Sequence, residues 1–272
     1  MNILLSCLSF KNFTGSEIYF YELATALQDL GHQVSVFSRF TGEPLQDKTN
    51  NITFLNKEDI KNRNFDKVIF SHGIVMWDYL KNVKSESFIN IIHSEVLDLE
   101  QPILDKRVTK YVGIRPSIVE KFDIKCDLIF NPFDFSRFNP IRNRKLDIKN
   151  KVVLFPGSID YLRVNVMRYL FDLSEKQNFK ILHVGRDDYN LQHKNFQSIQ
   201  PQWHVEDFYK KCDIVSGIFL GRTSIEGLLS GKKVLQFDVT DKGKINKVYW
   251  HTEDNLDKFE RTFVAKNIID ES

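Results

Sequence analysis

Two short segments of the chain combine glycine with side chains that can bind an anion or a sugar hydroxyl. They are Thr14-Gly15-Ser16-Glu17 and Gly221-Arg222-Thr223-Ser224-Ile225-Glu226, and each stands between an apolar run and a helix-like pattern. The first turn of a helix exposes unpaired backbone N–H groups and the positive end of the helix dipole, which attract anions. Each segment also has the spacing of a capping box, in which a threonine and the glutamate three residues later only start the helix. Anion binding and helix capping are both open for each segment.

The second segment adds two charged side chains that suit a nucleotide. An arginine just before the start of a helix has no evident packing role, so Arg222 is a candidate for contact with a diphosphate, together with the backbone amides of the loop. Glu226 lies four residues later, and its two carboxylate oxygens can accept hydrogen bonds from the vicinal hydroxyls of a ribose. We therefore interpret this segment as a nucleotide-binding site.

A third candidate anion site is the turn Pro156-Gly157-Ser158 with Arg163 beyond it. Arg163 stands at the expected start of a helix, where a cation opposes the helix dipole and requires an anionic partner. A phosphate group is such a partner, and a solvated surface arginine is the alternative.

Two histidines, His72 and His93, directly follow buried apolar runs. In a parallel sheet such strand ends point into the cleft where ligands bind. A histidine there can donate a hydrogen bond to a sugar hydroxyl or a phosphate, or transfer a proton. A structural role is the alternative for each. The remaining histidines are less well placed: His32, His183, His193, His204 and His251.

The elements that would position these residues alternate between strands and helices. An apolar run at 2–8, helical periodicity over 17–30 that ends at Gly31, and a β-branched run at 33–38 form a βαβ pattern. Further strands are predicted at 67–71, 88–92, 111–114 and 127–130, with helices at 76–83 and 116–122. The pattern starts again with strands at 152–155, 180–184, 213–218 and 233–237, and with helices at 163–177, 223–230 and 252–266. The alternation predicts two doubly wound parallel sheets.

The two halves are separated by a stretch of different composition. Residues 131–150 hold prolines, asparagines and basic residues without periodicity, as a linker does. We predict an α/β protein with two Rossmann-like domains facing a cleft. Its parts are an N-terminal domain at 1–137, a linker at 138–150, a C-terminal domain at 151–250 and a final helical segment at 251–272.

Length, charge and composition exclude several other classes. The chain has 272 residues, of which 42% are hydrophobic and 27% charged, as in ordinary globular proteins. A net charge of +2 argues against a nucleic-acid binder. The three cysteines are far apart, which argues against a zinc site or a disulfide framework and favours a reducing compartment. The N-terminal run lacks the features of a signal peptide and no apolar run reaches 18 residues, so we expect a cytoplasmic protein.

Several familiar motifs are missing from the sequence. It contains neither G-x-G-x-x-G nor a P-loop, which argues against a dinucleotide-dependent dehydrogenase and a P-loop enzyme. It also lacks G-x-S-x-G, H-E-x-x-H and D-x-D, which argues against common hydrolases, zincins and metal-chelating sugar-nucleotide sites. The chemistry is therefore expected at the carboxyl ends of the strands.

Taken together, the segments resemble a known family. The chain resembles retaining GT-B nucleotide-sugar glycosyltransferases, the family 4-like group that includes bacterial polysaccharide and lipopolysaccharide enzymes. The resemblance runs nearly from end to end and is carried by Thr14-Gly15-Ser16-Glu17, Gly31-His32-Gln33-Val34, Ser71-His72-Gly73, and residues 131–140, 153–157 and 224–234. The stretch 131–140 and the helix with the glutamate are its most specific parts.

The resemblance implies transfer of a hexose from a nucleoside-diphosphate sugar of the UDP or GDP type to a glycan or lipid-linked acceptor, with retention and without a metal or cofactor. The donor would bind mainly to the C-terminal domain and the acceptor to the N-terminal domain. The implied donor-binding residues are Gly15, Gly157, Arg163, Arg222, Thr223, Ser224 and Glu226, the acceptor-binding residues are Ser16 and His72, and the catalytic residue is His93. The final helix would pack on the N-terminal domain, and peripheral association with a membrane is left open.

Two positions depart from the usual pattern of that family. Ile218 stands where many members carry a glutamate eight residues before the one at 226, and Ser158 stands where an arginine is common. A non-catalytic nucleotide- or glycan-binding relative, or a sugar-nucleotide epimerase, is therefore an alternative to a glycosyltransferase.

Overall fold

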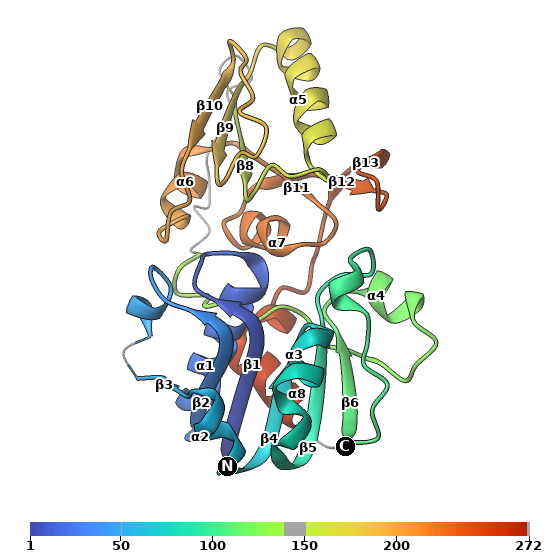
Figure 1. The fold of residues 1–272 in the computed structure, drawn as a ribbon. Helices are drawn as coiled ribbons and strands as arrows, with labels where there is room; N and C mark the ends of the chain where they lie inside the picture. Colours follow the sequence, from blue (N-terminus) through green and yellow to red (C-terminus); the bar gives the residue numbers. More distant parts are fainter. Residues whose placement is uncertain (50, 139–150, 271–272) are drawn as a thin grey trace. The chain divides into compact units, whose positions relative to one another are not determined.

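The computed structural model describes residues 1–49, 51–138 and 151–270, which form two compact units (Figure 1). The N-terminal unit contains Met1–Asp134 and Asp257–Ser272, and the C-terminal unit contains Phe135–Leu256. From the sequence, the N-terminal domain was predicted to end at residue 137 and the C-terminal domain at residue 250. Of the linker expected at 138–150, residues 139–150 lie outside the described part of the chain.

A seven-stranded parallel sheet forms the centre of the N-terminal unit. Its strand order is β3-β2-β1-β4-β5-β6-β7. The strands are β1 (Asn2–Phe10), β2 (Gln33–Thr41), β3 (Thr53–Phe54), β4 (Asn64–Phe70), β5 (Lys84–Ile92), β6 (Val108–Gly113) and β7 (Asp127–Leu128). The order reverses between β1 and β4, and in open α/β sheets ligands bind beside such a reversal, at the carboxyl ends of the strands.

Continuous apolar runs explain why the central strands of this sheet are buried. In β1, for example, Ile3, Leu4 and Leu5 are all fully buried, as is typical of a parallel strand with both faces covered. Leu4 belongs to one hydrophobic cluster with Val68 of β4 and Phe88 of β5. These core residues hold the neighbouring strands β1, β4 and β5 side by side.

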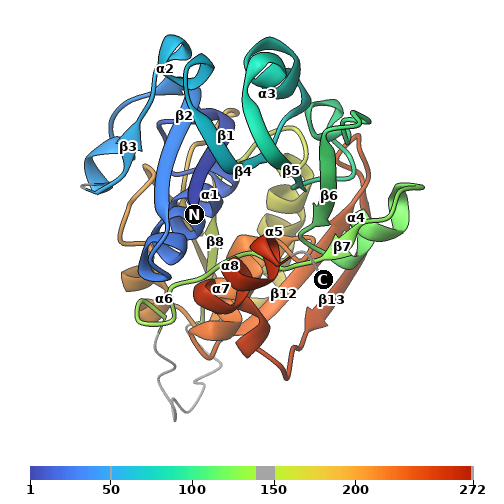
Figure 2. The ribbon, with the colours of Figure 1, turned by 90° about the horizontal axis from the view of Figure 1, so that it is seen from below.

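Helices and short 3₁₀ turns connect the strands of the N-terminal unit. They are α1 (Gly15–Asp29), η1 (Gln46–Lys48), α2 (Lys57–Lys61), α3 (Gly73–Asp78), η2 (Leu80–Asn82), η3 (Asp98–Glu100), α4 (Pro116–Lys121), η5 (Asp257–Phe259) and α8 (Arg261–Ile269). Helix α1 buries a stripe that includes Tyr19, Phe20, Leu23 and Leu27. Figure 2 shows α8 beside α1, against which it packs.

The final helix begins later than the sequence predicted. A helix was expected over 252–266, but β13 runs to His251 and α8 starts only at Arg261. Phe133 explains the delay: its backbone N–H donates to the Phe259 carbonyl at 2.9 Å, and its carbonyl accepts from Arg261 N at 3.0 Å. This strand-like pairing holds the backbone extended at Glu260, whose side chain then caps α8 by accepting from the backbone N–H of Phe263.

The C-terminal unit is built on a six-stranded sheet in the order β10-β9-β8-β11-β12-β13. The strands are β8 (Val152–Pro156), β9 (Lys180–Val184), β10 (Phe196–Ile199), β11 (Ile214–Ile218), β12 (Lys233–Val239) and β13 (Ile245–His251), and the helices are α5 (Val164–Gln177), α6 (Glu206–Lys211) and α7 (Arg222–Leu229). The first five strands are parallel, whereas β13 is antiparallel to β12. The sequence missed β10 and β13 because these edge strands have few buried apolar residues.

Candidate functional site

The best-defined polar centre of the C-terminal unit lies at the start of α7. Gly221 is the N-cap, and its carbonyl accepts from the backbone N–H groups of Ser224 and Ile225. Thr223 is therefore already inside the helix, and the capping box expected between Thr223 and Glu226 is wrong. Because the helix starts earlier than expected, Glu226 lies beyond its first turn and is available for another role.

Glu226 is buried and both of its carboxylate oxygens accept hydrogen bonds. Oε2 accepts from the Tyr209 hydroxyl at 2.7 Å, and Oε1 accepts from Arg222 Nε at 2.8 Å. Tyr209, on α6, is fully buried, and burial together with the adjacent negative charge raises the pKa of Tyr209 well above its ordinary value. Each carboxylate oxygen can accept more than one hydrogen bond, so the carboxylate has capacity left for two ribose hydroxyls.

Tyr209 is a site residue that sequence reasoning missed. It stands in a short polar segment, Glu206–Lys211, with no motif to mark it. Its ring also contacts Phe138 edge-on, with ring centroids 6.0 Å apart. Only the packing of α6 beside α7 reveals that the Tyr209 hydroxyl reaches Glu226.

Glycine at 217 lets the first turn of α7 approach the end of β11. A Cβ atom at Gly217 would lie 2.7 Å from Thr223 Oγ1 and 3.0 Å from Ser224 Oγ. Ser224 is fully buried, and its hydroxyl donates to the Phe219 carbonyl at 3.3 Å. Two hydroxyl side chains were expected at the donor site. The Ser224 hydroxyl is bonded to the loop backbone, and Thr223 is half-buried. Ile218, at the end of β11, is also buried.

The turn after β8 is fixed by a buried histidine. Gly157 adopts φ +106°, a conformation that favours glycine. His183 Nε2 lies 2.7 Å from the Gly157 carbonyl and Nδ1 lies 2.8 Å from Ser198 Oγ. Burial lowers the pKa of His183, so the neutral imidazole donates from Nε2 and accepts at Nδ1. A histidine that the sequence did not favour thus holds the predicted donor-binding glycine.

Arg163 has an anionic partner within its own turn. It is the N-cap of α5, and its guanidinium pairs with the Asp160 carboxylate. The other oxygen of Asp160 accepts from the backbone N–H groups of Leu162 and Arg163. Asp160 is therefore the anionic partner that the position of Arg163 required. If Arg163 also binds a phosphate, the guanidinium must either contact both anions or release Asp160.

In the N-terminal unit, one carboxylate organises the loop between β1 and α1. Glu17 is buried and accepts from the backbone N–H groups of Thr14 at 3.3 Å, Lys11 at 2.9 Å and Asn12 at 3.1 Å. The capping role of Glu17 is thus confirmed. Gly15 is exposed and Ser16 half-buried in the first turn that this carboxylate holds.

His72 is buried and both of its ring nitrogens face groups of the protein. Nδ1 accepts from the backbone N–H of Leu8 at 3.2 Å, and Nε2 lies 3.1 Å from Glu100 Oε1. The residue is the N-cap of α3 and has φ 68°, which is uncommon outside glycine. The structure thus places His72 within a protein network, and direct contact with an acceptor would require one of these bonds to break.

His93 follows β5 and packs against α1. Its ring meets the ring of Tyr19 edge-on, with centroids 4.8 Å apart, and its backbone N–H donates to Glu100 Oε2 at 3.2 Å. His93 Nε2 is buried without a hydrogen-bond partner among residues 1–49, 51–138 and 151–270. Burial lowers the pKa of His93 to about 4, although the nearby charge of Glu100 opposes the shift. The imidazole is therefore neutral near neutral pH.

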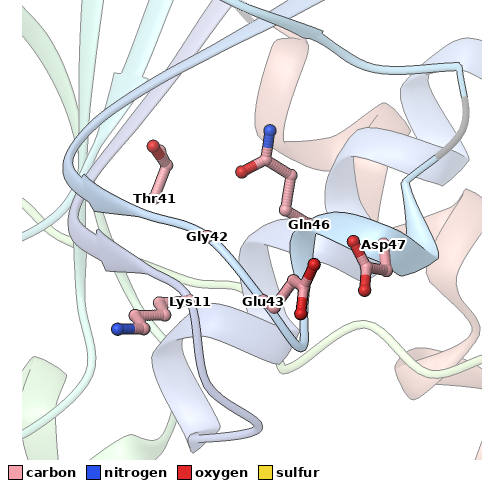
Figure 3. Close-up of a pocket in the computed structure, with 6 residues that line it drawn as sticks. All are labelled: Lys11, Thr41, Gly42, Glu43, Gln46 and Asp47. Atoms are coloured by element: carbon pink, nitrogen blue, oxygen red, sulfur yellow. The ribbon is translucent and has the colours of Figure 1, made fainter.

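A polar groove of about 760 Å³ opens beside the carboxyl ends of β1 and β2 (Figure 3). Its lining residues are Lys11, Thr41, Gly42, Glu43, Gln46 and Asp47. Glu17 holds the backbone of Lys11, and the carbonyl of Lys11 accepts from Leu45 N at 2.9 Å, so the two walls are tied together. No motif in the sequence indicates this groove, because its residues are ordinary loop residues.

The described residues include neither a membrane-spanning helix nor a cluster of metal ligands. None of the helices in the described part of the chain is both long and apolar enough to cross a membrane. No group of three or more His, Cys, Asp or Glu residues outside positions 50, 139–150 and 271–272 is arranged to hold a metal ion.

Comparison with known proteins finds similarity only in structure. No protein-family model and no curated protein matches the sequence. AviGT4, a glycosyltransferase involved in avilamycin A biosynthesis, matches with a TM-score of 0.65 and 12% identity, over 99% of this chain and 96% of its own. HepE of Anabaena, solved in complex with UDP and glucose, matches with a TM-score of 0.66 and 11% identity, over 86% of this chain and 80% of its own. WaaG, a glycosyltransferase involved in lipopolysaccharide biosynthesis, matches with a TM-score of 0.60 and 14% identity, over 88% of this chain and 82% of its own.

At these identities the similarity concerns the fold, and it extends over both units. Each unit of this chain is a largely parallel sheet with connecting helices, as the sequence predicted. The chain therefore has the α/β fold with two Rossmann-like domains that is found in GT-B glycosyltransferases.

Proposed function

We propose that the protein is a glycosyltransferase that moves a sugar from a nucleoside-diphosphate donor of the UDP or GDP type to a glycan or lipid-linked acceptor. The observation that carries the proposal is Glu226, a buried carboxylate that is held by Tyr209 and Arg222 on α7, the helix that follows the parallel strand β11. Ligands of doubly wound folds bind at such strand ends. The UDP bound in the HepE structure is consistent with a nucleotide ligand for this fold.

In this proposal the C-terminal unit binds the donor. Glu226 accepts hydrogen bonds from the ribose hydroxyls, and the backbone from Arg222 to Ser224 faces the diphosphate. Gly157 leaves room for the donor at the turn after β8. Arg163 binds a phosphate either while it keeps its ion pair with Asp160 or in place of that pair. Helix N-termini and guanidinium groups can stabilise the leaving diphosphate, each contributing about 3 kcal/mol in a site without water. We therefore propose transfer without a metal.

The N-terminal unit binds the acceptor in this proposal. Gly15 and Ser16 lie in the first turn of α1, and in this proposal Gly15 contributes to donor binding and Ser16 to acceptor binding. His93 is the proposed catalytic residue, because its imidazole is neutral and its Nε2 has no hydrogen-bond partner among the described residues. We propose retention of the anomeric configuration, which NMR of the product tests directly.

The first test is ligand-induced stabilisation. The protein is heated with UDP, GDP, ADP, CMP and their common sugar conjugates, and Glu226→Ala is compared with Glu175→Ala, which alters an exposed glutamate of the same unit. A nucleotide at 100 times its dissociation constant should stabilise the parent by about 2.7 kcal/mol. For each variant the stabilisation is the difference between its melting temperatures with and without nucleotide. We expect Glu226→Ala to lose most of this stabilisation and Glu175→Ala to keep it.

Either of two results would contradict the proposal. Stabilisation by none of the nucleotides would remove the donor site. Equal stabilisation of the parent and Glu226→Ala would show that Glu226 does not hold the ribose.

A non-catalytic binding protein is the second candidate, and Ile218 favours it. The buried Ile218 stands where the resembling family often has a glutamate, so a polar group toward the sugar is lost. Binding of one nucleotide sugar without transfer to any acceptor of a broad glycan panel would support this candidate, and a transferred product would exclude it.

A further inference from the structure

A buried carboxylate, Glu100, ties two histidines together at the carboxyl end of the N-terminal sheet. Glu100 Oε1 lies 3.1 Å from His72 Nε2, and Oε2 accepts from the backbone N–H of His93 at 3.2 Å. The side chain of Glu100 is 5% exposed and that of His72 is 8% exposed, so both interactions are shielded from water. The sequence did not mark Glu100, which lies in the short turn η3.

Hydrogen bonding decides which nitrogen of His72 carries the proton. The backbone N–H of Leu8 donates to Nδ1 at 3.2 Å, so Nδ1 is an acceptor and Nε2 carries the hydrogen. Nε2 therefore donates to Glu100. The carboxylate thus receives one donor on each oxygen, from His72 and from His93, and it links residues that follow β4 and β5 to the end of β1.

The backbone conformation of His72 indicates that this network is firm. A non-glycine residue at φ 68° costs free energy and persists only where its surroundings hold it. Burial opposes ionisation of Glu100, yet the hydrogen bonds from His72 and from the backbone of His93 leave the pKa of Glu100 below its ordinary value. The ionised, doubly bonded carboxylate is therefore the stable form at neutral pH.

The network holds the backbone of His93 and makes no hydrogen bond to Nε2 of its ring. The ring of His93 is packed against Tyr19 and Phe20, with centroids 4.8 Å and 6.1 Å away. Its Nε2 has no hydrogen-bond partner in the part of the chain that the structure describes. Glu100 accepts a hydrogen bond from the backbone of His93. It therefore helps to set the position of the ring without forming a hydrogen bond to Nε2.

We propose that Glu100 is a positioning residue, which holds His93 in place for sugar transfer through the His93 backbone N–H and the imidazole of His72. The inference rests on the proposed glycosyltransferase function. It also gives His72 a role different from direct acceptor binding.

The test compares Glu100→Gln with Asp98→Asn, a matched loss of one charge in the same turn at an exposed residue. The glutamine amide has a single acceptor oxygen, and its NH₂ group would face a donor, so one of the two bonds is lost. Because the proposed donor site lies on the other unit, we expect kcat to fall about 10- to 100-fold with the donor KM unchanged within about twofold. Asp98→Asn should match the parent in both.

A spectroscopic measurement follows the network itself. Nitrogen-15 NMR of the histidine rings should show His72 as the Nε2–H tautomer in the parent and in Asp98→Asn, and a changed His72 signal in Glu100→Gln. If Glu100→Gln does not fold, Glu100→Asp takes its place. This variant keeps both acceptor oxygens, but its side chain is shorter by one methylene group. We therefore expect kcat to fall less than is expected for Glu100→Gln, and the donor KM to equal that of the parent.

The outcomes separate this inference from the proposed function. A parent enzyme without transfer activity removes the proposed function and the positioning role with it. An active parent with an unchanged kcat in Glu100→Gln, or in Glu100→Asp where that variant is used, overturns only the positioning role. The same holds for a fall in kcat that Asp98→Asn reproduces.

Discussion

The charged side chains of the candidate site are held by specific partners, as three pairs show. Glu226 is bonded to Tyr209, Glu100 to His72, and Arg163 to Asp160. Removing a carboxylate from water is costly unless hydrogen bonds replace its hydration, and these donors meet that cost. A buried donor deleted from such a pair should therefore change both the stability and the geometry of the site.

Tyr209→Phe removes the hydroxyl that orients Glu226 and leaves the ring in place. A hydrogen bond to a charged group contributes about 1.5–3 kcal/mol, so we expect unfolding free energy to fall by about 2 kcal/mol. The dissociation constant of the nucleotide should rise about 10-fold, since the carboxylate is no longer held toward the ribose. Urea unfolding and calorimetric titration measure the two effects.

Tyr249→Phe is the control for this change. The Tyr249 hydroxyl accepts from Gln236 and donates to Asp238 in the same unit, with no contact to Glu226. It should lower stability and leave nucleotide binding unchanged. If both variants weaken binding equally, the effect of Tyr209 does not act through Glu226.

Turns at the carboxyl ends of neighbouring strands support one another at the scale of elements. The turn after β8 contains Gly157, and the turn after β9 contains Gly185. A Cβ atom at Gly185 would lie 2.1 Å from the Gly157 carbonyl oxygen, and His183 donates to that same oxygen. The backbone of the proposed donor site thus depends on a close approach that only glycine allows.

Gly185→Ala should be strongly destabilising because the added methyl group collides with backbone. We expect a loss of about 3 kcal/mol in unfolding free energy by urea denaturation. Gly15→Ala is the matched substitution at a place where a Cβ meets no atom within 4 Å, and it should change stability by no more than about 1 kcal/mol. Equal effects of the two variants would mean that the turns after β8 and β9 do not touch.

The N-terminal unit is assembled from two parts of the chain that the whole C-terminal unit separates. The chain leaves this unit after Asp134 and returns at Asp257. The returning segment pairs with Phe133, and Arg261 bonds to Asp29 and Asp134, both at 3.1 Å. The stability of the N-terminal unit should therefore depend on residues 257–270.

Phe259→Ala tests this dependence in the intact protein. Phe259 is 1% exposed and contacts the rings of Phe130 and Phe133, so its loss should destabilise the N-terminal unit by about 3–5 kcal/mol. Phe263→Ala removes a phenylalanine of the same segment that is 53% exposed, and it should cost less than about 1 kcal/mol. Hydrogen exchange shows which unit is affected, and equal protection in both variants would contradict the prediction.

The sequence by itself determined the fold class and most of the central elements. Helix α1 follows from its apolar spacing, the capping pair Thr14 and Glu17, and the final Gly31, all of which are local signals. The buried strands of both sheets follow from continuous apolar runs for the same reason. The segments at 15–16 and 221–226 were placed correctly at helix starts, but the capping partner expected for Glu226 and the start of the final helix were wrong.

Only the tertiary structure decided which side chains meet. Tyr209 reaches Glu226, Glu100 joins His72 to His93, and Phe133 delays the final helix by pairing with residues near 260. Each of these contacts depends on which strands are neighbours and on how a helix lies over them. Residue type and local spacing set how a segment folds, whereas the partners of a buried polar group are chosen by the packing of elements far apart in sequence.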